Sequence, residues 1–251
     1  MRCRIPLLAF WILCLVRLTT AQQVAPEKPL YQPSGNEAAI TGTINVSGAV
    51  PKPYLIDMAA DPVCVEANLR PQLDDLIVRE NNLQNAFVYV KSESLARYRF
   101  AMPDSDVVLV QRNCQFSPHV LGIRTGQTLQ IVNADRTTHN VHPTPKYNRE
   151  WNQTHPPAVP PMVKSFDHAE VLIPFKDNQH PWEKAYVAVM DHPFFAVSDE
   201  FGRFEIRGVP PGTYTLVVWH ERLGEQEIEI TVAPNEIRNA EFTYDADKKQ
   251  P

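Results

Sequence analysis

The chain has little of what several large functional classes require. It carries only 4 cysteines in 251 residues, and its Lys and Arg are scattered along a chain of net charge −5. Nucleic-acid binding needs a basic stripe, so the sequence excludes a nucleic-acid partner. The chain also lacks a nucleophile elbow, a phosphate loop and a dinucleotide fingerprint. We therefore expect a protein that is not an enzyme.

Long hydrophobic runs are scarce as well. The run Ile5–Val16 follows Arg2 and Arg4 and is too short to cross a bilayer, which is typical of a secretory signal. We expect residues 1–21 to form this signal peptide and the mature chain to be periplasmic or extracellular. An uncleaved N-terminal anchor is the alternative. No later stretch is long and apolar enough for a membrane, so we expect no membrane integration.

Removal of the signal peptide would leave two cysteines, Cys64 and Cys114. In an exported protein such a pair predicts one disulfide. The alternative is that Cys114 is a free thiolate that binds a metal, which would leave Cys64 unpaired in an oxidising compartment.

The remaining sequence is typical of an all-β protein. Its 23 prolines would break most long helices, and helical periodicity is weak. Short segments rich in β-branched and aromatic residues alternate with Gly, Pro, Asn and Asp, which predicts antiparallel Greek-key sandwiches. The predicted strands are Ile40–Val46, Phe87–Val90, Val107–Val110, Thr128–Val132, Tyr186–Val189, Arg203–Ile206, Tyr214–Trp219, Glu227–Val232 and Ala240–Tyr244.

Two turn motifs mark the C-terminal third. An Asp-x-x-Gly-x-Phe motif at 199–204 is followed by a Pro-x-Gly-x-Tyr motif at 210–214, and Gly202 and Gly212 are expected to adopt positive φ angles there. The segment resembles the carboxypeptidase regulatory-like domain, a transthyretin-type β-sandwich. That resemblance implies a structural or adhesive role. Residues 42–48 and 83–90 resemble the opening strands of the same family.

The most informative stretch, residues 126–142, resembles a cupredoxin. A Gly-initiated strand ends in an Asn-x-Asp turn, and His139 with Asn140 follows a few residues later. In that family the His of this pair is the first copper ligand, and the Asn ties the two ligand loops together. The resemblance therefore implies that His139 binds a metal ion.

The other cupredoxin ligands come from one later loop, in the order Cys, His, Met. The matching loop here is 175–183, where His180 falls on the second imidazole. Secreted bacterial proteins labelled methylamine-utilisation proteins, which join the same two modules, carry Cys-x-x-His-Pro-Trp-Met in this loop. Aligned on His-Pro-Trp, Asp177 occupies the Cys position and Glu183 the Met position, so both sulfur ligands appear replaced by carboxylates.

This replacement decides the expected chemistry. A blue copper site needs a copper–thiolate bond, so blue-copper electron transfer is not expected unless Cys114 is recruited. Two imidazoles and two carboxylates still suit non-blue copper or another divalent metal such as zinc, which predicts a metal site at His139, His180, Asp177 and Glu183. His142 could replace a lost ligand, although an outer, structural role is favoured. The competing hypothesis is a metal-free adhesion or interaction module with a degenerate copper site.

These features predict the following domain organisation. Residues 22–37 are expected to be a flexible lead-in, 38–104 an N-terminal β segment, and 105–190 a cupredoxin-like domain. Within it, the proline-rich segment 143–170 is expected to be a long loop that a protein partner could contact. Residues 191–245 are expected to form the carboxypeptidase regulatory-like sandwich, and 246–251 a tail. Whether the cupredoxin-like segment is inserted into one split sandwich or stands beside it is left open by the sequence.

Overall fold

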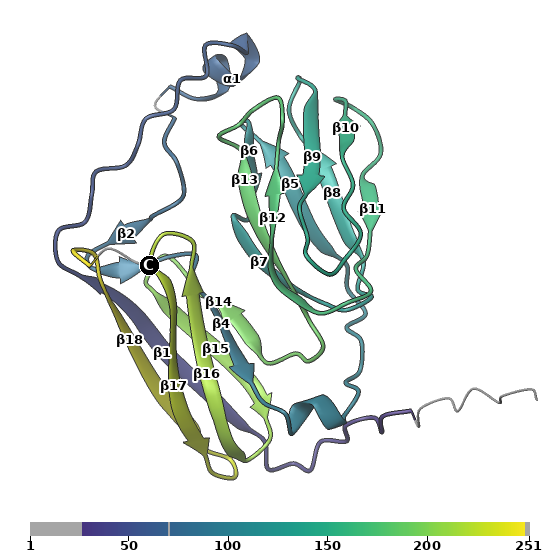
Figure 1. The fold of residues 1–251 in the computed structure, drawn as a ribbon, viewed down its shortest axis with the longest axis vertical. Helices are drawn as coiled ribbons and strands as arrows, with labels where there is room; N and C mark the ends of the chain where they lie inside the picture. The colour runs from purple at the N-terminus through teal and green to yellow at the C-terminus, as the bar shows by residue number, and fades with distance from the viewer. Residues whose placement is uncertain (1–26, 70, 249–251) are drawn as a thin grey trace, which may run out of the picture.

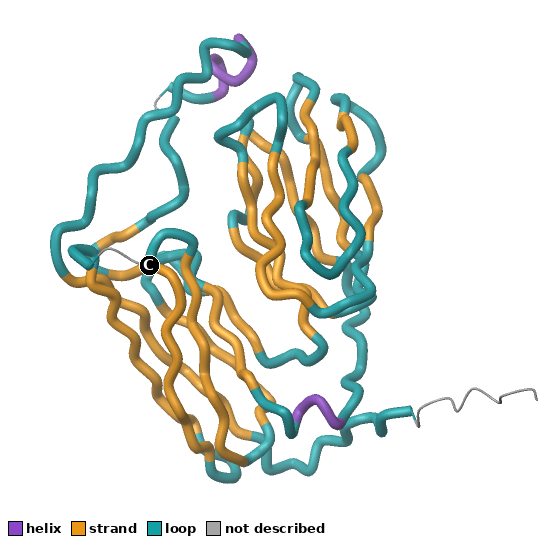
Figure 2. Tube along the Cα trace, viewed as in Figure 1, coloured by secondary structure: helices purple, strands orange, loops and turns teal. Residues whose placement is uncertain are grey.

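The computed structural model describes residues 27–69 and 71–248, and strands dominate it (Figures 1 and 2). The all-β prediction is confirmed. The described helices are short: α1 (Pro62–Ala67) and the 3-10 helix η1 (Leu95–Arg97). In the described part of the chain, no helix combines the length and the apolar character needed to cross a membrane. The predicted signal peptide, 1–21, lies outside the described residues.

All the strands predicted from alternation are present. They are β1 (Ala38–Ser47), β4 (Phe87–Lys91), β5 (Val107–Arg112), β8 (Leu129–Asn133), β13 (Lys184–Met190), β15 (Arg203–Val209), β16 (Gly212–His220), β17 (Gly224–Val232) and β18 (Ile237–Asp245). Most of the strands that were not predicted are short or carry polar residues and proline. The full set is β2 (Val78–Arg79), β3 (Asn82–Leu83), β6 (Gln115–Ser117), β7 (Val120–Arg124), β9 (His139–Pro143), β10 (Gln153–His155), β11 (Met162–Lys164), β12 (Glu170–Lys176) and β14 (Phe195–Val197).

One sandwich combines strands from both ends of the chain, and we call it the split sandwich. One of its sheets has the order β15-β1-β3-β2, with β18 also paired to β1; the other has the order β14-β4-β16-β17. Ile40 and Ile44 alternate inward along β1, and Tyr244 lies in the same core. The Tyr244 hydroxyl donates to the carbonyl oxygen of Val218 at 3.1 Å, which satisfies its buried polar atom.

The middle of the chain forms a second sandwich, the site sandwich, which lies beside the first in Figure 1. Its sheets have the orders β10-β9-β12-β13-β7 and β11-β8-β5-β6. Leu109, Ile123, Ile131 and Phe175 are among its fully buried core residues. The sheets are mixed rather than purely antiparallel, because β5 pairs with β8 and β7 with β13 in parallel, as β1 does with β18 in the split sandwich.

Three local expectations need correction. The proline-rich segment 143–170 contains β10 and β11, because its prolines flank these strands and leave their backbone N–H groups free to pair with β9 and β8. The described part of the lead-in, 27–37, makes specific contacts: Leu30 forms an isolated bridge with Arg99. Gly202 has φ +68°, as expected, but the second left-handed glycine of this region is Gly208 rather than Gly212.

Between β1 and β2 the chain leaves the split sandwich, carries α1 at the far end of the excursion, and returns (Figure 1). We call this segment the strap, residues 48–69 and 71–77. Asp61 caps α1, because its side chain accepts from the backbone N–H of Val63 at 2.8 Å. Cys64 of α1 is disulfide-bonded to Cys114, which follows β5. The predicted disulfide is therefore confirmed, and it joins the strap to the site sandwich.

Candidate metal centre

Strand register brings the two predicted ligand segments together. β12 pairs antiparallel with β9, with Lys176 opposite His142, so the residues after β12 run toward the start of β9, where His139 lies. Asp177 follows β12 directly, and His180 and Glu183 lie in the turn that leads into β13. The structure thus brings together the four predicted ligands, although His139 lies 38 residues from Asp177 in the chain.

The turn that carries Asp177 and His180 is shaped by its own hydrogen bonds. Asp177 Oδ1 accepts from the backbone N–H groups of Gln179 at 2.6 Å and His180 at 3.0 Å, which is an Asx-type turn. The N–H of Glu183 donates to the carbonyl oxygen of His180 at 2.8 Å. These bonds leave Asp177 Oδ2 free to face the two imidazoles.

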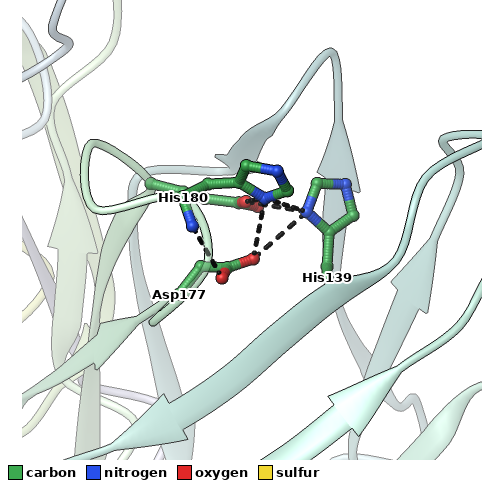
Figure 3. Close-up of side chains that lie close together, drawn as sticks. His139, Asp177 and His180 are labelled. Atoms are coloured by element: carbon green, nitrogen blue, oxygen red, sulfur yellow. Dashed lines mark hydrogen bonds and ion pairs between the residues drawn. The ribbon is translucent and has the colours of Figure 1, made fainter. Parts of the chain in front are cut away.

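The donor atoms converge on one point. Figure 3 shows the rings of His139 and His180 turned toward each other, with the Asp177 carboxylate beside both. The two Nδ1 atoms lie 3.0 Å apart, and Asp177 Oδ2 lies 3.1 Å from that of His139 and 3.3 Å from that of His180. Glu183 Oε2 lies 3.1 Å and 3.9 Å from the same two nitrogens. Ligands about 2.0–2.1 Å from a tetrahedral ion lie about 3.3 Å from one another, so the spacing fits such an ion.

All four side chains are buried: the exposed fraction is 0% for His139, 2% for Asp177, 4% for His180 and 1% for Glu183. Burial of so many ionisable groups in one place is costly unless they neutralise one another or hold an ion. In a degenerate copper site near the surface, the same side chains could remain solvated. The burial therefore distinguishes this cluster from an ordinary solvated set of polar side chains.

The pKa values shift strongly. Burial alone would lower the pKa of His139, but its contacts with Asp135, Asp177 and Glu183 outweigh burial and raise the pKa to about 11. Burial would likewise lower the pKa of His180, yet the Asp177 and Asp61 carboxylates raise it. For Asp177, hydrogen bonds from the imidazoles and the backbone overcome the opposing effect of burial and hold its pKa far below the usual range.

Glu183 behaves in the opposite way. Burial raises its pKa to about 7, against the lowering effect of His139. Its two carboxylate oxygens accept no hydrogen bond of good geometry from any residue that the structure describes, although Oε2 lies close to His139 Nδ1. A buried carboxylate without hydrogen bonds is unusual, because the lost solvation is uncompensated. A cation between Glu183 and the imidazoles would compensate for it, so the residues present fit a metal ion.

Two further carboxylates orient the imidazoles, and the sequence did not single them out. Asp135 Oδ2 lies 2.9 Å from His139 Nε2, and Asp61 Oδ2 lies 3.1 Å from His180 Nε2. A carboxylate on the outer ring nitrogen fixes the ring and makes the inner nitrogen a better ligand. Asp135 belongs to the Asn-x-Asp turn that the sequence showed, which is a usable signal. Asp61 belongs to the strap, 119 residues from His180, and nothing local pointed to it.

Asn140 ties the two ligand segments together, as the resemblance implied. Its backbone N–H donates to Asp177 Oδ2 at 2.9 Å, and its side-chain oxygen accepts from the N–H of Asn178 at 3.2 Å. His142, the alternative ligand, lies apart from the donor cluster: its Nε2 lies 2.7 Å from a Glu150 carboxylate oxygen. Of the two histidines in this run, only His139 belongs to the cluster.

Comparison with known family models finds one match. Residues 176–245 match the carboxypeptidase regulatory-like domain family, which is less than half of the chain. No curated protein matches the chain.

The solved structures that are similar to part of the chain include cupredoxins. A purple cupredoxin from Nitrosopumilus maritimus is 18% identical over 34% of this chain and all 100% of its own, with a TM-score of 0.30. A reduced amicyanin variant is 20% identical over 41% of this chain and 98% of its own, also at 0.30. The Cu-containing nitrite reductase from Thermus scotoductus SA-01 is 17% identical over 37% of this chain but only 24% of its own, at 0.33. At these TM-scores the similarity carries no argument about the site, which rests on its own geometry.

Proposed function

We propose that this protein binds one divalent metal ion, non-blue copper or zinc, through His139, His180, Asp177 and Glu183. Both carboxylates stand in this proposal where related copper sites carry sulfur ligands. The protein is then a secreted metal-binding protein, periplasmic or extracellular, that carries the metal or supports slow redox chemistry, rather than an enzyme. The proposed bounds are 105–190 for the site sandwich, with 38–104 and 191–245 as the two parts of the chain that together supply the split sandwich and the strap.

The observation that carries the proposal is the buried donor cluster itself. Two imidazole nitrogens and two carboxylates lie within one group whose donor atoms are all within 4.8 Å of one another. Among the described residues, no hydrogen bond to the Glu183 carboxylate compensates for its lost solvation there. Imidazole and carboxylate are ligands that Cu(II) and Zn(II) share, and Cu(II) binds a given nitrogen and oxygen site more tightly. When bound, the ion would supply positive charge among the carboxylates and a Lewis-acid centre.

In this proposal, the residues that contact the four ligands hold them in position. Asp135 and Asp61 hold the outer ring nitrogens, so that both Nδ1 atoms point inward. Asn140 fixes the spacing of the two ligand segments through its bonds to Asp177 and Asn178. The strap places Asp61 against His180 and so covers that ring from one side.

A titration of the purified full chain tests the proposal. After chelator treatment, the protein is titrated with Cu(II) or Zn(II) against a competing chromophoric chelator. We expect one ion per chain, without the intense visible absorption of a copper–thiolate bond. His180→Ala should weaken binding by at least about 100-fold, because loss of a mere outer partner of a ligand already costs about 10–100-fold.

The matched control is His142→Ala, three residues from His139 in the same strand but directed at Glu150. It should bind the metal as the unsubstituted protein does. Equal loss in both variants would contradict the assignment. If the unsubstituted protein binds neither ion, the metal-free interaction module is left as the function. In that case Tyr147 and Val163 of the segment 143–170, exposed at 72% and 65%, are the first residues to test for a protein partner.

A further inference from the structure

The Cys64–Cys114 disulfide lies against the donor cluster. Cys64 belongs to a group of potential ligands with Asp61 and His180, and Cys114 to a group with His139 and Asp135; within each group the donor atoms lie within 4.8 Å of one another. Each sulfur is therefore a neighbour of one of the two imidazoles. Both cysteines are fully buried, so the disulfide forms part of the wall of the site.

One side of the disulfide packs against a methionine and a tryptophan. Met58, 2% exposed, packs with both cysteines in one buried cluster, against the partly buried Trp182. The Trp182 indole N–H donates to the carbonyl oxygen of Cys114 at 3.0 Å, and its ring centroid lies 5.3 Å from that of His180. Trp182 thus lies beside both Cys114 and the His180 ring. On the opposite side of the rings, Asp177 and Glu183 supply only oxygen.

We propose that reduction of the Cys64–Cys114 disulfide gives a second coordination state, in which the two thiolates and the two imidazoles bind Cu(I). Disulfide sulfur is a poor ligand, whereas thiolates select soft ions such as Cu(I). Oxidised, the protein offers imidazole and carboxylate to a divalent ion. Reduced, it offers sulfur and imidazole to a monovalent one. The Cu(I) state rests on the proposed function in that it uses His139 and His180. It is tested separately, because the gain in Cu(I) affinity on reduction depends on the two cysteine sulfur atoms.

The redox step balances with a dithiol reductant. Its first thiolate attacks one sulfur of the Cys64–Cys114 bond, and its second thiol resolves the mixed disulfide. The protein disulfide gains two electrons and two protons and becomes two thiols, while the dithiol becomes a disulfide. Each cysteine thiol then loses its proton when its sulfur binds Cu(I).

The strap gives this exchange a structural consequence. Besides the disulfide and the packing of Met58, the half-buried Asp61 links the strap to the site: it contacts His180 Nε2 at 3.1 Å and accepts from the Thr137 hydroxyl at 2.7 Å. A Cu(I) ion held by Cys64 and Cys114 would replace the covalent link with a coordinate one. The strap therefore stays attached in both states while its sulfur atoms become available.

The test compares the oxidised full chain with the same protein reduced by a dithiol and desalted without oxygen. Cu(I) affinity is measured by competition with bicinchoninate, and the ligands by X-ray absorption at the copper edge. We expect the reduced protein to bind one Cu(I) at least about 100-fold more tightly than the oxidised protein, with sulfur in its first coordination shell. Equal affinity in the two states, or a shell of nitrogen and oxygen alone, would overturn the inference.

Two controls isolate the sulfur atoms. The double variant Cys64→Ser/Cys114→Ser should lack the reductant-dependent gain, and circular dichroism checks that it is folded. Should it not fold, the reduced unsubstituted protein alkylated with iodoacetamide answers the same question, because both thiols are then blocked. Persistent tight Cu(I) binding in either would overturn the inference.

The two proposals fail separately. If the oxidised protein binds a divalent ion but reduction does not change Cu(I) affinity, the Cu(I) state is wrong and the proposed function stands. If the reduced protein binds Cu(I) through sulfur but the oxidised protein binds no divalent ion, the proposed function is wrong and the Cu(I) state stands.

Discussion

The two sandwiches differ in what they bury. The core of the split sandwich is made of aliphatic and aromatic side chains from both sheets, among them Ile44, Leu216 and Phe242. The site sandwich has a similar apolar core, but one end of it holds buried imidazoles and carboxylates. Burial of apolar groups stabilises a fold, whereas burial of ionisable groups opposes it. We therefore expect the split sandwich to contribute chiefly to stability, and the buried polar end of the site sandwich to carry the chemistry.

Within the described residues, every group of three or more metal-ligating side chains lies at this end of the site sandwich or on the strap that covers it. A cluster that weakens the fold is retained when it serves a purpose. If the two regions differ in this way, substitutions in the split sandwich should lower stability without changing metal affinity, and substitutions in the donor cluster should lower metal affinity without loss of stability.

The largest expected effect is on the split sandwich. Ile44→Ala removes a fully buried side chain from β1 and should lower the free energy of unfolding by about 2–5 kcal/mol, through lost burial and the cavity left behind. Because Ile44 does not belong to the donor cluster, metal affinity of the folded variant should be unchanged. Chemical denaturation and the metal titration measure the two effects. A parallel loss of affinity would mean that the sandwiches are not separable in this way.

The next effect concerns Glu183 in the metal-free protein. Its folded pKa of about 7 lies above the ordinary value of 4.5, so between these values the folded state holds the proton more firmly than the unfolded state. Stability from this group is present below pH 4.5 and is lost as the pH rises through 7. Glu183→Gln keeps the shape and does not titrate, so its advantage over the unsubstituted protein should grow between pH 5 and pH 8, by on the order of 1–3 kcal/mol.

The same variant should bind metal more weakly, because a carboxylate ligand becomes an amide. A stabilised fold with weakened metal binding is the pattern expected of a functional ligand. Denaturation curves of the chelator-treated proteins at both pH values measure the first part, with Glu150→Gln on the exposed side of His142 as control. A stability difference that does not change with pH would contradict the assignment of the raised pKa to Glu183.

Sequence reasoning reached the strands whose alternation is set by one buried face. β1, with its regular inward and intermediate positions, is an example. It missed β9 and β12, where the chemistry of the site interrupts alternation: His139, Asn140 and His142 occupy β9, and Pro174 lies in β12. These strands form because neighbours on both sides supply the hydrogen bonds, and this information is absent from a local pattern.

The site, like the strands, was predicted only in part. The motifs around His139 and His180 led to the four proposed ligands, because these lie in two short segments. Asp61 could not be found this way, because its contact with His180 depends on the path of the strap and on the disulfide that anchors it. A long-range contact of this kind has no periodicity and no motif.

Asp61 offers a smaller and more selective change. Asp61→Asn keeps an efficient N-cap for α1, so the strap should retain its helix. It removes the negative charge beside His180 Nε2, and metal affinity should fall by about 10-fold, the lower end of the effect of losing such a partner. The free energy of unfolding should hardly change. Unchanged metal affinity would show that the Asp61 carboxylate does not improve His180 as a ligand.

The smallest effect is expected at the surface of the strap. Arg136 and Glu66 form an ion pair at 3.3 Å, but their side chains are 81% and 73% exposed. Solvent and salt screen such a pair, so Arg136→Ala should cost less than about 1 kcal/mol and leave metal affinity unchanged. Denaturation at low and high salt checks this. A loss as large as that of Asp61→Asn in metal affinity would mean that surface charge, rather than the buried disulfide and Asp61, holds the strap against the site.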